Sequence, residues 1–392
     1  MNKKKPLLLL TLLTASLLAG VAGAQQEINI SREVNVIGGV KPLPIALSGF
    51  SGEAAAVLKF DLEVQGFKVV DDSSAQYELA GGNNGDVHGQ LNDRTARTSL
   101  LAKAYSGGTT RTQAHALADD VVSAVFHMPG IGQTKIAFKV DTGANSEVYV
   151  SDFDGHNAQA VTHDNTIVAA PTWVPRHLAL FYVSYKLGNA HIWFHNLATG
   201  ARDVFARYGG SNLSPAVSPD GSKVAMILSK SGWVDLWVCN IDGSGLKELT
   251  HSPQDESSPC WSPDGKWILF AGKVGERRVL RKISPEGGEA QTISTAGAGS
   301  PSEPDWSPDG KWIVFTSQYS RGFNICVIPA AGGPATVVVE GEDPSWSPNS
   351  RTVVFARRTG NGRVLSLLDV FTKQVKDVKQ ISGSDSQPSW AK

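Results

Sequence analysis

The chain has 392 residues, of which 41% are hydrophobic and 19% charged, and its formal net charge is −1. A near-neutral chain of this length can bury more than one core, and its charge does not suggest a nucleic-acid-binding protein or a protein with a polybasic membrane-binding surface. Its 40 glycines, 20 prolines and 10 tryptophans indicate many turns around a packed core. This composition excludes a disordered chain, a coiled coil and a polytopic membrane protein.

The first 24 residues have the pattern of an export signal. A basic start, Lys3-Lys4-Lys5, precedes an apolar run over residues 7–18, and Ala22-Gly23-Ala24 supplies the small residues at which a signal peptidase cuts. The run is shorter than the roughly 20 apolar residues that cross a bilayer. We therefore expect cleavage of residues 1–24 after Ala24 and an exported, soluble protein without direct membrane insertion.

Residues 25–128 predict a small α/β domain. Short apolar runs bounded by Gly or polar residues indicate strands, and apolar residues three and four apart indicate helices. In chain order these patterns predict a strand over 43–47, a helix over 53–64, a strand over 67–70, a turn at Asn83-Asn84-Gly85, a strand over 99–104 and a helix over 112–128. The last helix is the clearest, since Ala114, Leu117 and Val121 share one face and Pro129-Gly130 follows.

A repeat organises residues 129–392. The segment from Pro259 to Phe270 recurs from Pro304 to Phe315 with the shared pattern Pro-x-Trp-Ser-Pro-Asp-Gly-Lys-Trp-Ile-x-Phe. Looser copies begin at Pro171, Pro215 and Pro344, and a stub stands at Pro388-Ser389-Trp390. The copies begin 40 to 45 residues apart, which is the length of one four-stranded propeller blade.

Each part of the repeat has a structural reason. Ser262-Pro263-Asp264-Gly265 suits a type I turn, with Pro at the second position and Gly at the fourth. In the following residues, 266–270, apolar side chains occur at both odd and even positions, as in a strand that is covered on both faces. A further strand over 234–241 and a short one near 246–249 show the rest of a unit, so each unit holds about four strands.

The two ends of the repeat region complement each other. Residues 134–138 match the Lys-Trp-Ile-x-Phe strand without a Pro-x-Trp before them, whereas the stub at 388–390 has nothing after it. Joined, they make a sixth blade, so that the C-terminal strand closes the ring and leaves no open sheet edge. The sequence therefore predicts a two-domain α+β protein, with a small N-terminal α/β domain over 25–128 and a six-bladed β-propeller over 129–392.

The residue before each repeat proline enters an innermost strand. By the symmetry of the repeat these residues ring one mouth of the propeller: Ala170, Ser214, Ser258, Glu303, Asp343 and Gln387. Five of the six are polar or acidic, which suits a wet, hydrogen-bonding protein interface, although loop solvation alone also favours polar residues there.

Motifs that suggest a metal have simpler explanations. His191 and His195 fall in a strand pattern, where residues four apart are separated by roughly 13 Å, too far for one metal ion. Asp152-Phe153-Asp154-Gly155 lacks the remaining ligands of a calcium loop and matches the turn at Asp242-Gly243. We therefore expect no metal site and no cofactor.

The repeats, the six-blade count and the domain order resemble the TolB family of Tol-Pal envelope systems. The spacing Arg111-x-x-x-His115-x-x-x-Asp119 on the last helix before the propeller also matches, although it serves packing between domains or a solvated face rather than catalysis. Glu27, Ile28, Asn29 and Ile30 resemble the short extended segment that opens mature family members. The chain departs from the pattern at 173–177, where the turn motif is degraded, and in its short N-terminal domain.

The resemblance implies a monomeric, non-enzymatic periplasmic adaptor. Family members bind Pal, a peptidoglycan-associated lipoprotein, at the propeller mouth and TolA, an inner-membrane protein, through the N-terminal segment. They support outer-membrane integrity and constriction at cell division. On this basis Asn212 and Ser257, next to the predicted ring, are also expected to face the Pal-like partner.

Two other functions are compatible with the sequence. A secreted propeller lyase or sugar-processing enzyme would have scattered catalytic residues that no motif reveals. A secreted binding module could serve a different partner. A peptidase is disfavoured, since no Gly-x-Ser-x-Gly motif occurs.

Overall fold

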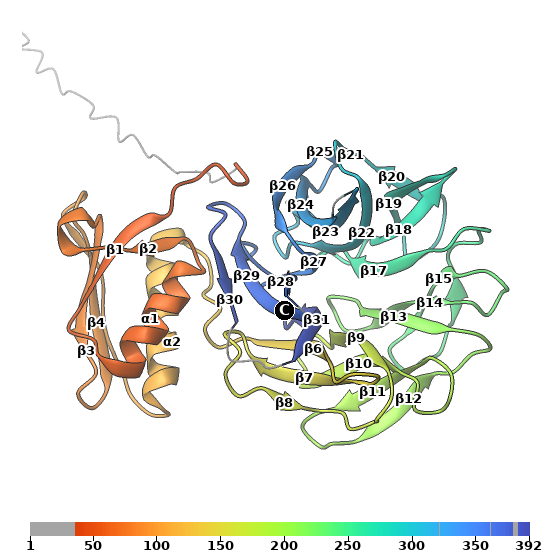
Figure 1. The fold of residues 1–392 in the computed structure, drawn as a ribbon, viewed down its shortest axis with the longest axis horizontal. Helices are drawn as coiled ribbons and strands as arrows, with labels where there is room; N and C mark the ends of the chain where they lie inside the picture. Colours follow the sequence, from red (N-terminus) through yellow and green to blue (C-terminus); the bar gives the residue numbers. More distant parts are fainter. Residues whose placement is uncertain (1–35, 321, 361, 379–382) are drawn as a thin grey trace, which may run out of the picture. The chain divides into compact units, whose positions relative to one another are not determined.

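The computed structural model describes residues 36–320, 322–360, 362–378 and 383–392. The predicted signal peptide and Glu27–Ile30 lie outside the described residues. Residues 43–126 form an α/β region, and the remainder forms a β-propeller (Figure 1). The two helices have 12 and 17 residues, and no helix in the described part of the chain is long and apolar enough to cross a membrane.

The N-terminal region is a five-stranded sheet with two helices on one face (Figure 1). Its elements are β1 (Leu43–Ser48), α1 (Gly52–Glu63), β2 (Phe67–Val69), a 3-10 turn (Asp72–Ser74), β3 (Tyr77–Gly82), β4 (Val87–Asp93), β5 (Thr98–Tyr105) and α2 (Thr110–Phe126). The strand order is β2-β1-β3-β4-β5, in which β1 runs parallel to both its neighbours and the others pair antiparallel. The core between sheet and helices includes Ile45, Leu58, Leu79 and Leu117, each fully buried.

Local chemistry sets the bounds of α2. Thr109 caps its start, because its side chain accepts a hydrogen bond from the Thr112 backbone N–H while the Thr112 side chain accepts one from the Thr109 N–H. His127 ends the helix in the left-handed conformation, with φ of 56°. The predicted strands and helices of this region are confirmed to within two residues, whereas β3 and β4, on either side of the predicted Asn83-Asn84-Gly85 turn, were not predicted.

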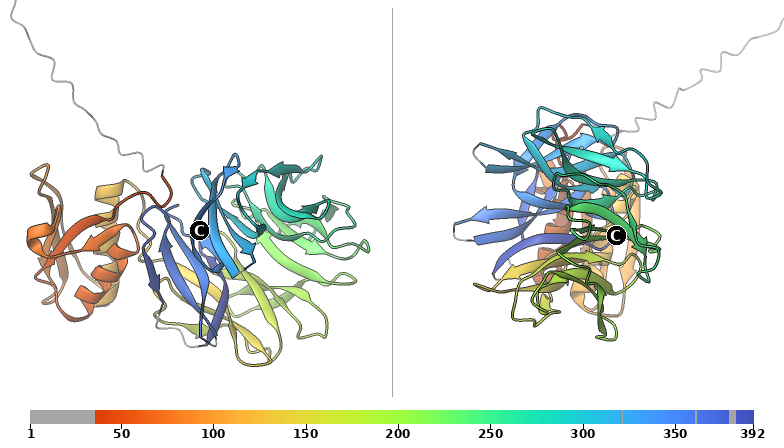
Figure 2. Two further views of the ribbon diagram at one scale, coloured as in Figure 1. Left: turned by 45° about the horizontal axis from the view of Figure 1, so that its top comes forward. Right: turned by 90° about the vertical axis from the view of Figure 1, so that its right-hand side faces the viewer.

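The propeller has six four-stranded antiparallel sheets that fan around a centre (Figure 2). The first three are β31 (Ser384–Trp390), β6 (Lys135–Asp141), β7 (Ser146–Asp152) and β8 (Gln159–Ala160); β9 (Val168–Trp173), β10 (Ala179–Ser184), β11 (His191–Asn196) and β12 (Arg202–Ala206); and β13 (Asn212–Val217), β14 (Lys223–Leu228), β15 (Asp235–Asn240) and β16 (Lys247–Glu248).

The other three sheets complete the ring. They are β17 (Ser257–Trp261), β18 (Ile268–Val274), β19 (Arg277–Ile283) and β20 (Gln291–Ile293); β22 (Ser300–Trp306), β23 (Trp312–Tyr319), β24 (Gly322–Pro329) and β26 (Thr336–Glu340); and β27 (Glu342–Trp346), β28 (Thr352–Thr359), β29 (Gly362–Asp369) and β30 (Val375–Asp377). A short parallel pair, β21 (Thr295–Ala296) and β25 (Gly333–Pro334), links two of them. The predicted six-bladed propeller is confirmed.

The C-terminal strand closes the ring as predicted. β31 pairs antiparallel with β6, with Trp390 opposite Ile136. The Trp390 side chain is 2% exposed, and its indole N–H donates to Thr134 Oγ1 at 2.8 Å. The first blade is therefore built from both ends of the propeller sequence.

The repeated residues stabilise turns within the blades and contacts between neighbouring blades. In the Ser262–Gly265 turn the Gly265 N–H donates to the Ser262 carbonyl at 2.9 Å, and Gly265 has φ of 69°, which glycine adopts without strain. Two repeat tryptophans reach the preceding blade: Trp261 Nε1 donates to the Ala216 carbonyl at 2.9 Å, and Trp173 Nε1 to the Ser389 carbonyl at 3.0 Å. These bonds give the buried indole N–H groups of Trp261 and Trp173 a partner. Trp306 Nε1 instead donates to the Gly310 carbonyl of its own turn at 3.3 Å.

Candidate functional site

The first strands of the six blades surround a cavity of about 540 Å3. Its wall consists largely of the repeat residues, including the proline of every repeat and four repeat tryptophans, Trp173, Trp261, Trp306 and Trp390. The structure brings together on this wall all six residues that the sequence places in a ring: Ala170, Ser214, Ser258, Glu303, Asp343 and Gln387. All six are half-buried. We refer to them as the channel ring.

Every residue of the channel ring has a left-handed backbone. Their φ values are 50° for Ala170, 47° for Ser214, 54° for Ser258, 48° for Glu303, 56° for Asp343 and 49° for Gln387. In every blade the pairing with the second strand shifts register next to this residue. Such a bulge re-aims one side chain out of the alternation of its strand. A left-handed non-glycine residue is itself costly, by roughly 1–2 kcal/mol, so the six-fold recurrence marks a built feature of the fold.

The channel ring is chained by side-chain to backbone hydrogen bonds along half of its circumference. The Asp343 carboxylate accepts a bond from the Gln387 N–H at 3.0 Å, and the Gln387 side-chain oxygen accepts one from the Ala170 N–H at 2.8 Å. Glu303 Oε2 lies 3.4 Å from the Asp343 N–H in the same arrangement. Glu303, Asp343 and Gln387 thus each accept a hydrogen bond from the backbone of the next ring residue. The side chains of Ala170, Ser214 and Ser258 are too short to do this.

Two carboxylates of the ring lie side by side. Burial, together with the neighbouring charge of Glu303, raises the pKa of Asp343 to about 8, well above the usual range for aspartate. At the other end of the cavity Lys392 Nζ lies 2.6 Å from Asp305 Oδ2, and Arg176 also lines the wall. The cavity wall therefore carries both acidic and basic groups, which suits polar recognition.

The raised pKa of Asp343 predicts a stability that falls as pH rises. Between pH 4 and 8 the folded protein keeps a proton that the unfolded chain has lost, so folding becomes less favourable through this window and the full loss is reached above it. We expect the free energy of unfolding of Asp343→Asn to exceed that of the parent at pH 9 by at least about 1.4 kcal/mol, the equivalent of one pKa unit. The difference between the two proteins should be smallest at pH 4. Urea unfolding at both pH values measures this difference.

The matched control for this prediction is Asp220→Asn. Hydrogen bonds from Ser218 and Ser222 lower the pKa of Asp220 to about 2, so its titration lies outside the tested range. Its substitution is expected to leave the change in stability between pH 4 and pH 9 as it is in the parent. An Asp343→Asn variant with the parent's pH dependence would contradict the assignment.

The two predicted neighbours of the ring do not line the cavity. Asn212 is fully buried: its Nδ2 donates to the carbonyls of Ala190 at 3.1 Å and Tyr208 at 3.0 Å, and its Oδ1 accepts from the Tyr208 N–H at 2.9 Å. The expectation that Asn212 faces a partner is therefore wrong, because its polar atoms are used to close the loop before β13. Ser257 lies half-buried beside the ring, where its hydroxyl accepts a bond from the Arg278 guanidinium.

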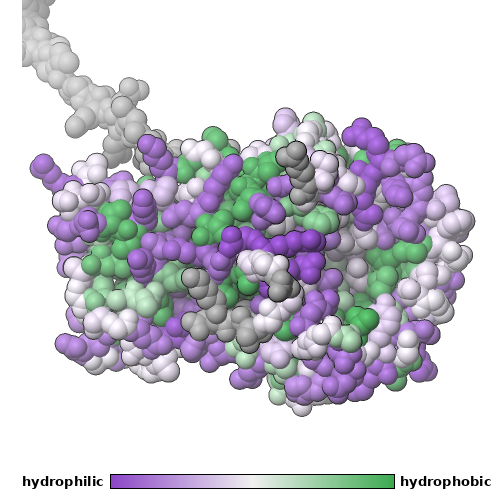
Figure 3. Space-filling view, viewed as in Figure 1, coloured by the Kyte–Doolittle hydropathy of each residue, from purple (hydrophilic) through white to green (hydrophobic). Residues whose placement is uncertain are grey.

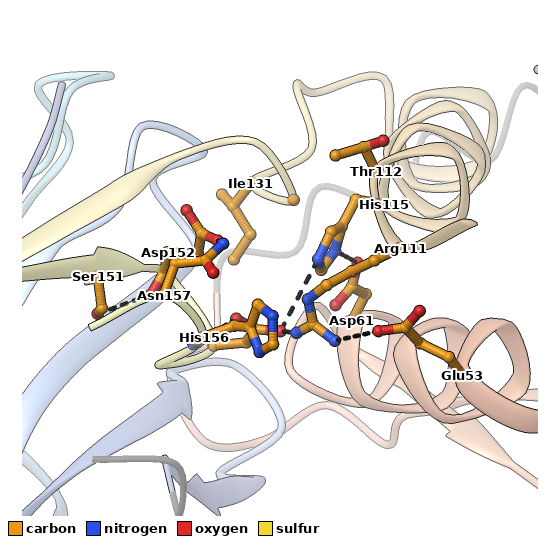
Figure 4. A network of polar contacts seen from close by, with 12 residues as sticks. Glu53, Asp61, Arg111, Thr112, His115, Ile131, Ser151, Asp152, His156 and Asn157 are labelled. Carbon is orange, nitrogen blue, oxygen red and sulfur yellow. Dashed lines mark hydrogen bonds and ion pairs between the residues drawn. The ribbon is translucent and has the colours of Figure 1, made fainter. Parts of the chain in front are cut away.

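Arg111 and His115 lie where α2 meets the propeller (Figure 4), and Asp119 follows on the same helix. Arg111 forms an ion pair with Asp154, in the turn after β7, and His115 Nδ1 lies 2.6 Å from Asp61 Oδ2 on α1. Asp119 accepts a hydrogen bond from the Gly132 N–H at 2.8 Å. The motif thus takes part in packing between the N-terminal region and the propeller.

Burial at this contact changes the acidity of its carboxyl groups. It raises the pKa of Asp61 to about 6 against the opposing effect of His115, and it raises the pKa of Asp119 to about 6 as well. The Asp152–Gly155 segment is the expected turn, with the Gly155 N–H donating to the Asp152 carbonyl at 2.9 Å. The role of Asp154 as the partner of Arg111 was not predicted, because no sequence spacing links the two.

Histidine and carboxylate side chains also lie outside the channel. His195 lies on β11, where burial lowers its pKa to about 4, and His191 begins the same strand. One described set of side chains has ligand atoms within 4.8 Å of one another: Asp235, Glu248 and His251. His251 Nδ1 is 3.4 Å from Glu248 Oε1 and 4.0 Å from Asp235 Oδ2; the His251 side chain is 67% exposed, whereas Asp235 is buried and accepts hydrogen bonds from the Ser252 N–H and the Ser231 hydroxyl.

Comparisons with known proteins agree with this architecture. A family model described as TolB beta propeller domain matches residues 124–392. The "Tol-Pal system protein TolB" of Anaeromyxobacter dehalogenans strain 2CP-C is 29% identical over 263 residues, covering 56% of this chain and 60% of that protein. That of Bordetella pertussis is 28% identical over 208 residues, covering 52% of this chain and 48% of its own length. The chain thus spans between about half and three fifths of these relatives.

A solved structure shares the fold over nearly the whole chain. The crystal structure of TolB from Acinetobacter baumannii superposes with a TM-score of 0.82 at 22% sequence identity, covering 91% of this chain and 98% of that one. The similarity includes the N-terminal α/β region as well as the propeller, since the propeller alone would leave a quarter of the described chain unmatched. With a family model matched over more than half of its residues, the chain belongs to the TolB beta-propeller family.

Proposed function

We propose that this protein is a periplasmic adaptor of a Tol-Pal system, acting by binding rather than by catalysis. Its family membership and the name that its relatives share support this proposal. We further propose residues 1–24 as a cleaved signal peptide, 25–128 as an N-terminal domain and 129–392 as the propeller. As a monomeric adaptor it would support outer-membrane integrity and constriction during cell division.

The channel ring is the proposed seat of a Pal-like, peptidoglycan-associated lipoprotein. The observation that carries this assignment is the left-handed bulge, which directs one side chain from every blade onto one cavity wall. Ser214, Ser258, Glu303, Asp343 and Gln387 supply polar groups there, and Ser257 lies beside them. Half-buried polar groups around a hollow suit an interface that keeps water and exchanges hydrogen bonds with a partner.

A TolA-like inner-membrane protein is the second proposed partner. It would bind the segment Glu27-Ile28-Asn29-Ile30, which lies outside the described residues. Residues 28 and 30 are apolar and 27 and 29 polar, and this alternation suits an extended strand that adds to a partner's sheet edge. The two partners would thus use separate parts of the chain.

A charge reversal in the channel ring tests the first assignment. We expect Glu303→Lys with Asp343→Lys to weaken binding of the soluble domain of the Pal-like protein at least tenfold, because two acceptors become donors on the cavity wall. Isothermal titration calorimetry measures the affinity, and circular dichroism verifies the fold. The matched control is Glu286→Lys with Glu289→Lys, which reverses two exposed charges away from the cavity.

Two further results complete this test. Deleting residues 27–30 is expected to abolish binding of the TolA-like protein while leaving Pal-like affinity at the parent value. Unchanged Pal-like affinity in a folded ring variant would remove the channel ring from the interface. Loss of affinity in the control variant to the same degree would instead indicate a general electrostatic effect.

A further inference from the structure

A second surface is formed by the hairpin tips of three neighbouring blades, at the loops β10–β11, β14–β15 and β18–β19. Of the nine large hydrophobic residues that are exposed in the described chain, four lie on these tips and a fifth lies beside them. They are Tyr185 (36% exposed), Leu187 (52%), Trp233 (45%), Val274 (52%) and Ile167 (47%). We refer to them, with the basic residues between them, as the hairpin-tip surface.

The topology places these residues at one end of the propeller. Strands within a blade are antiparallel, so the loop between the second and third strands lies at the end where the first strand begins, opposite the Ser-Pro-Asp-Gly turns. Ile167 directly precedes β9, and its carbonyl accepts a bond from the Tyr185 N–H at 3.0 Å, which joins this loop to the first tip. The three blades follow one another around the ring, with contacts between β10 and β13 and between β14 and β17.

Each tip also carries exposed basic residues. Lys186 lies between Tyr185 and Leu187, Lys230 precedes Trp233, and Lys273 and Arg277 flank Val274. Lys230 Nζ lies 5.3 Å above the Trp237 ring, and Lys186 Nζ lies 3.3 Å from Asp164 Oδ1. Glu276 is the one acidic residue among the exposed residues of the three tips, and Asp164 beside the first tip pairs with Lys186. The excess of positive charge therefore comes from Lys230, Lys273 and Arg277. The net charge of −1 for the whole chain does not reveal this local excess of positive charge.

We propose that the hairpin-tip surface docks the protein peripherally on an anionic phospholipid bilayer. Trp and Tyr favour the boundary between headgroups and acyl chains, where leucine and valine side chains lose contact with water. Lysine and arginine next to them are attracted to anionic headgroups. None of these residues lines the channel cavity, so the inference does not depend on the proposed binding of a Pal-like protein.

The distribution of the apolar residues favours a bilayer over a protein partner. The apolar side chains are spread over the three tips and the loop before β9, and each of the three tips carries at least one exposed basic residue. The face shown in Figure 3 likewise carries hydrophobic patches separated by hydrophilic residues. A fluid lipid surface can accept separate anchors at several points, whereas a rigid protein surface must match them with a complementary shape.

Vesicle flotation tests the proposal. The full mature chain is mixed with vesicles of phosphatidylcholine alone or of phosphatidylcholine with phosphatidylglycerol. We expect binding to the anionic vesicles to exceed binding to the neutral ones at least tenfold, and to weaken at about 1 M salt, where charges are screened beyond about 3 Å.

Two variants separate the apolar and the charged contributions. Leu187→Ser with Trp233→Ser, and Lys273→Glu with Arg277→Glu, are each expected to reduce the partition coefficient on anionic vesicles at least tenfold. The matched controls change equivalent residues at the opposite end of the propeller: Leu178→Ser, which alters a side chain 49% exposed, and Lys266→Glu with Lys311→Glu. These controls are expected to bind as the parent does.

The outcomes are distinct. Equal binding of all variants, or no preference for anionic vesicles, overturns the proposal. If the tip variants keep parental vesicle binding and lose affinity for the Pal-like protein, the surface is a protein interface, which also overturns it. Failure of the ring variants to affect Pal-like binding leaves the vesicle result unchanged, so the two assignments are tested separately.

Discussion

Replacing Trp390 by alanine is expected to destabilise the protein by about 3–5 kcal/mol, the range for removing a buried Trp side chain. Trp390 is 2% exposed, stacks against Phe153 with ring centroids 6.4 Å apart, and donates from Nε1 to Thr134 Oγ1 at 2.8 Å. It also ends the strand that pairs with β6. The substitution therefore opens a cavity at the seam where the two ends of the propeller join, and urea unfolding followed by circular dichroism measures the loss.

Trp233→Ala is the matched control for the seam prediction. This indole is 45% exposed on a hairpin tip, so its removal is expected to change the free energy of unfolding by less than about 0.5 kcal/mol. Equal effects of the two substitutions would show that the C-terminal strand contributes no special stability. A Trp390→Phe variant is expected to keep part of the packing of Trp390 but to lack the hydrogen bond to Thr134. Its free energy of unfolding should therefore lie between those of the parent and of Trp390→Ala.

Replacing Arg351 by alanine is expected to cost about 3–5 kcal/mol, because it leaves a buried charge without its partner. Arg351 forms an ion pair with Asp369, and their side chains are 4% and 0% exposed. Its guanidinium also lies 4.4 Å from the centre of the Phe126 ring on α2, so one side chain joins the sixth blade to the N-terminal helix. The loss is measured by urea unfolding at neutral pH.

A double variant separates the charge of Arg351 from its packing. Arg351→Met with Asp369→Asn removes both charges while keeping much of the side-chain volume, and is expected to be more stable than Arg351→Ala. The control Arg94→Ala breaks ion pairs with Asp72, whose side chain is 76% exposed, and with Glu78, and is expected to cost far less than Arg351→Ala. A double variant less stable than Arg351→Ala would contradict the buried-charge explanation.

The repeat made the propeller predictable. A period of 40 to 45 residues, with complementary halves at 134–138 and 388–390, determines both the number of blades and the way the ring closes. The two helices were predictable because their apolar residues recur on one face. β3 was missed because its sequence, Tyr77-Glu78-Leu79-Ala80-Gly81-Gly82, ends in two glycines, which are poor strand formers.

The position of the channel ring was predictable from the sequence, whereas its backbone conformation was not. Symmetry placed the residue before each proline at the channel, since each begins the same repeat unit. The left-handed backbone was not predictable, because alanine, serine and glutamate seldom adopt it and only the bulge of the folded sheet imposes it. The position of Asn212 was also not predictable from the sequence. Asn212 lies two residues before the bulge, and its side chain is buried rather than directed to the channel.

Contacts between distant segments had no sequence signal. The pairs Arg111–Asp154 and Arg351–Asp369 each depend on how the chain brings separate elements together, and neither pair has a spacing typical of a motif. The hairpin-tip surface is a similar case, since its residues come from three loops and the exposed fraction of each is known only from the fold. Tertiary structure is thus needed wherever a site is assembled from several blades.

The left-handed bulges separate the placement of a side chain from its identity. Alanine, serine, glutamate, aspartate and glutamine all stand at φ between 47° and 56° around the same opening, so the sheet accepts quite different chemistry at these points. Single exchanges there alter the pattern of charge and size at the aperture without disturbing the hydrophobic interior of any blade. The same backbone conformation therefore presents five different kinds of side chain at this opening.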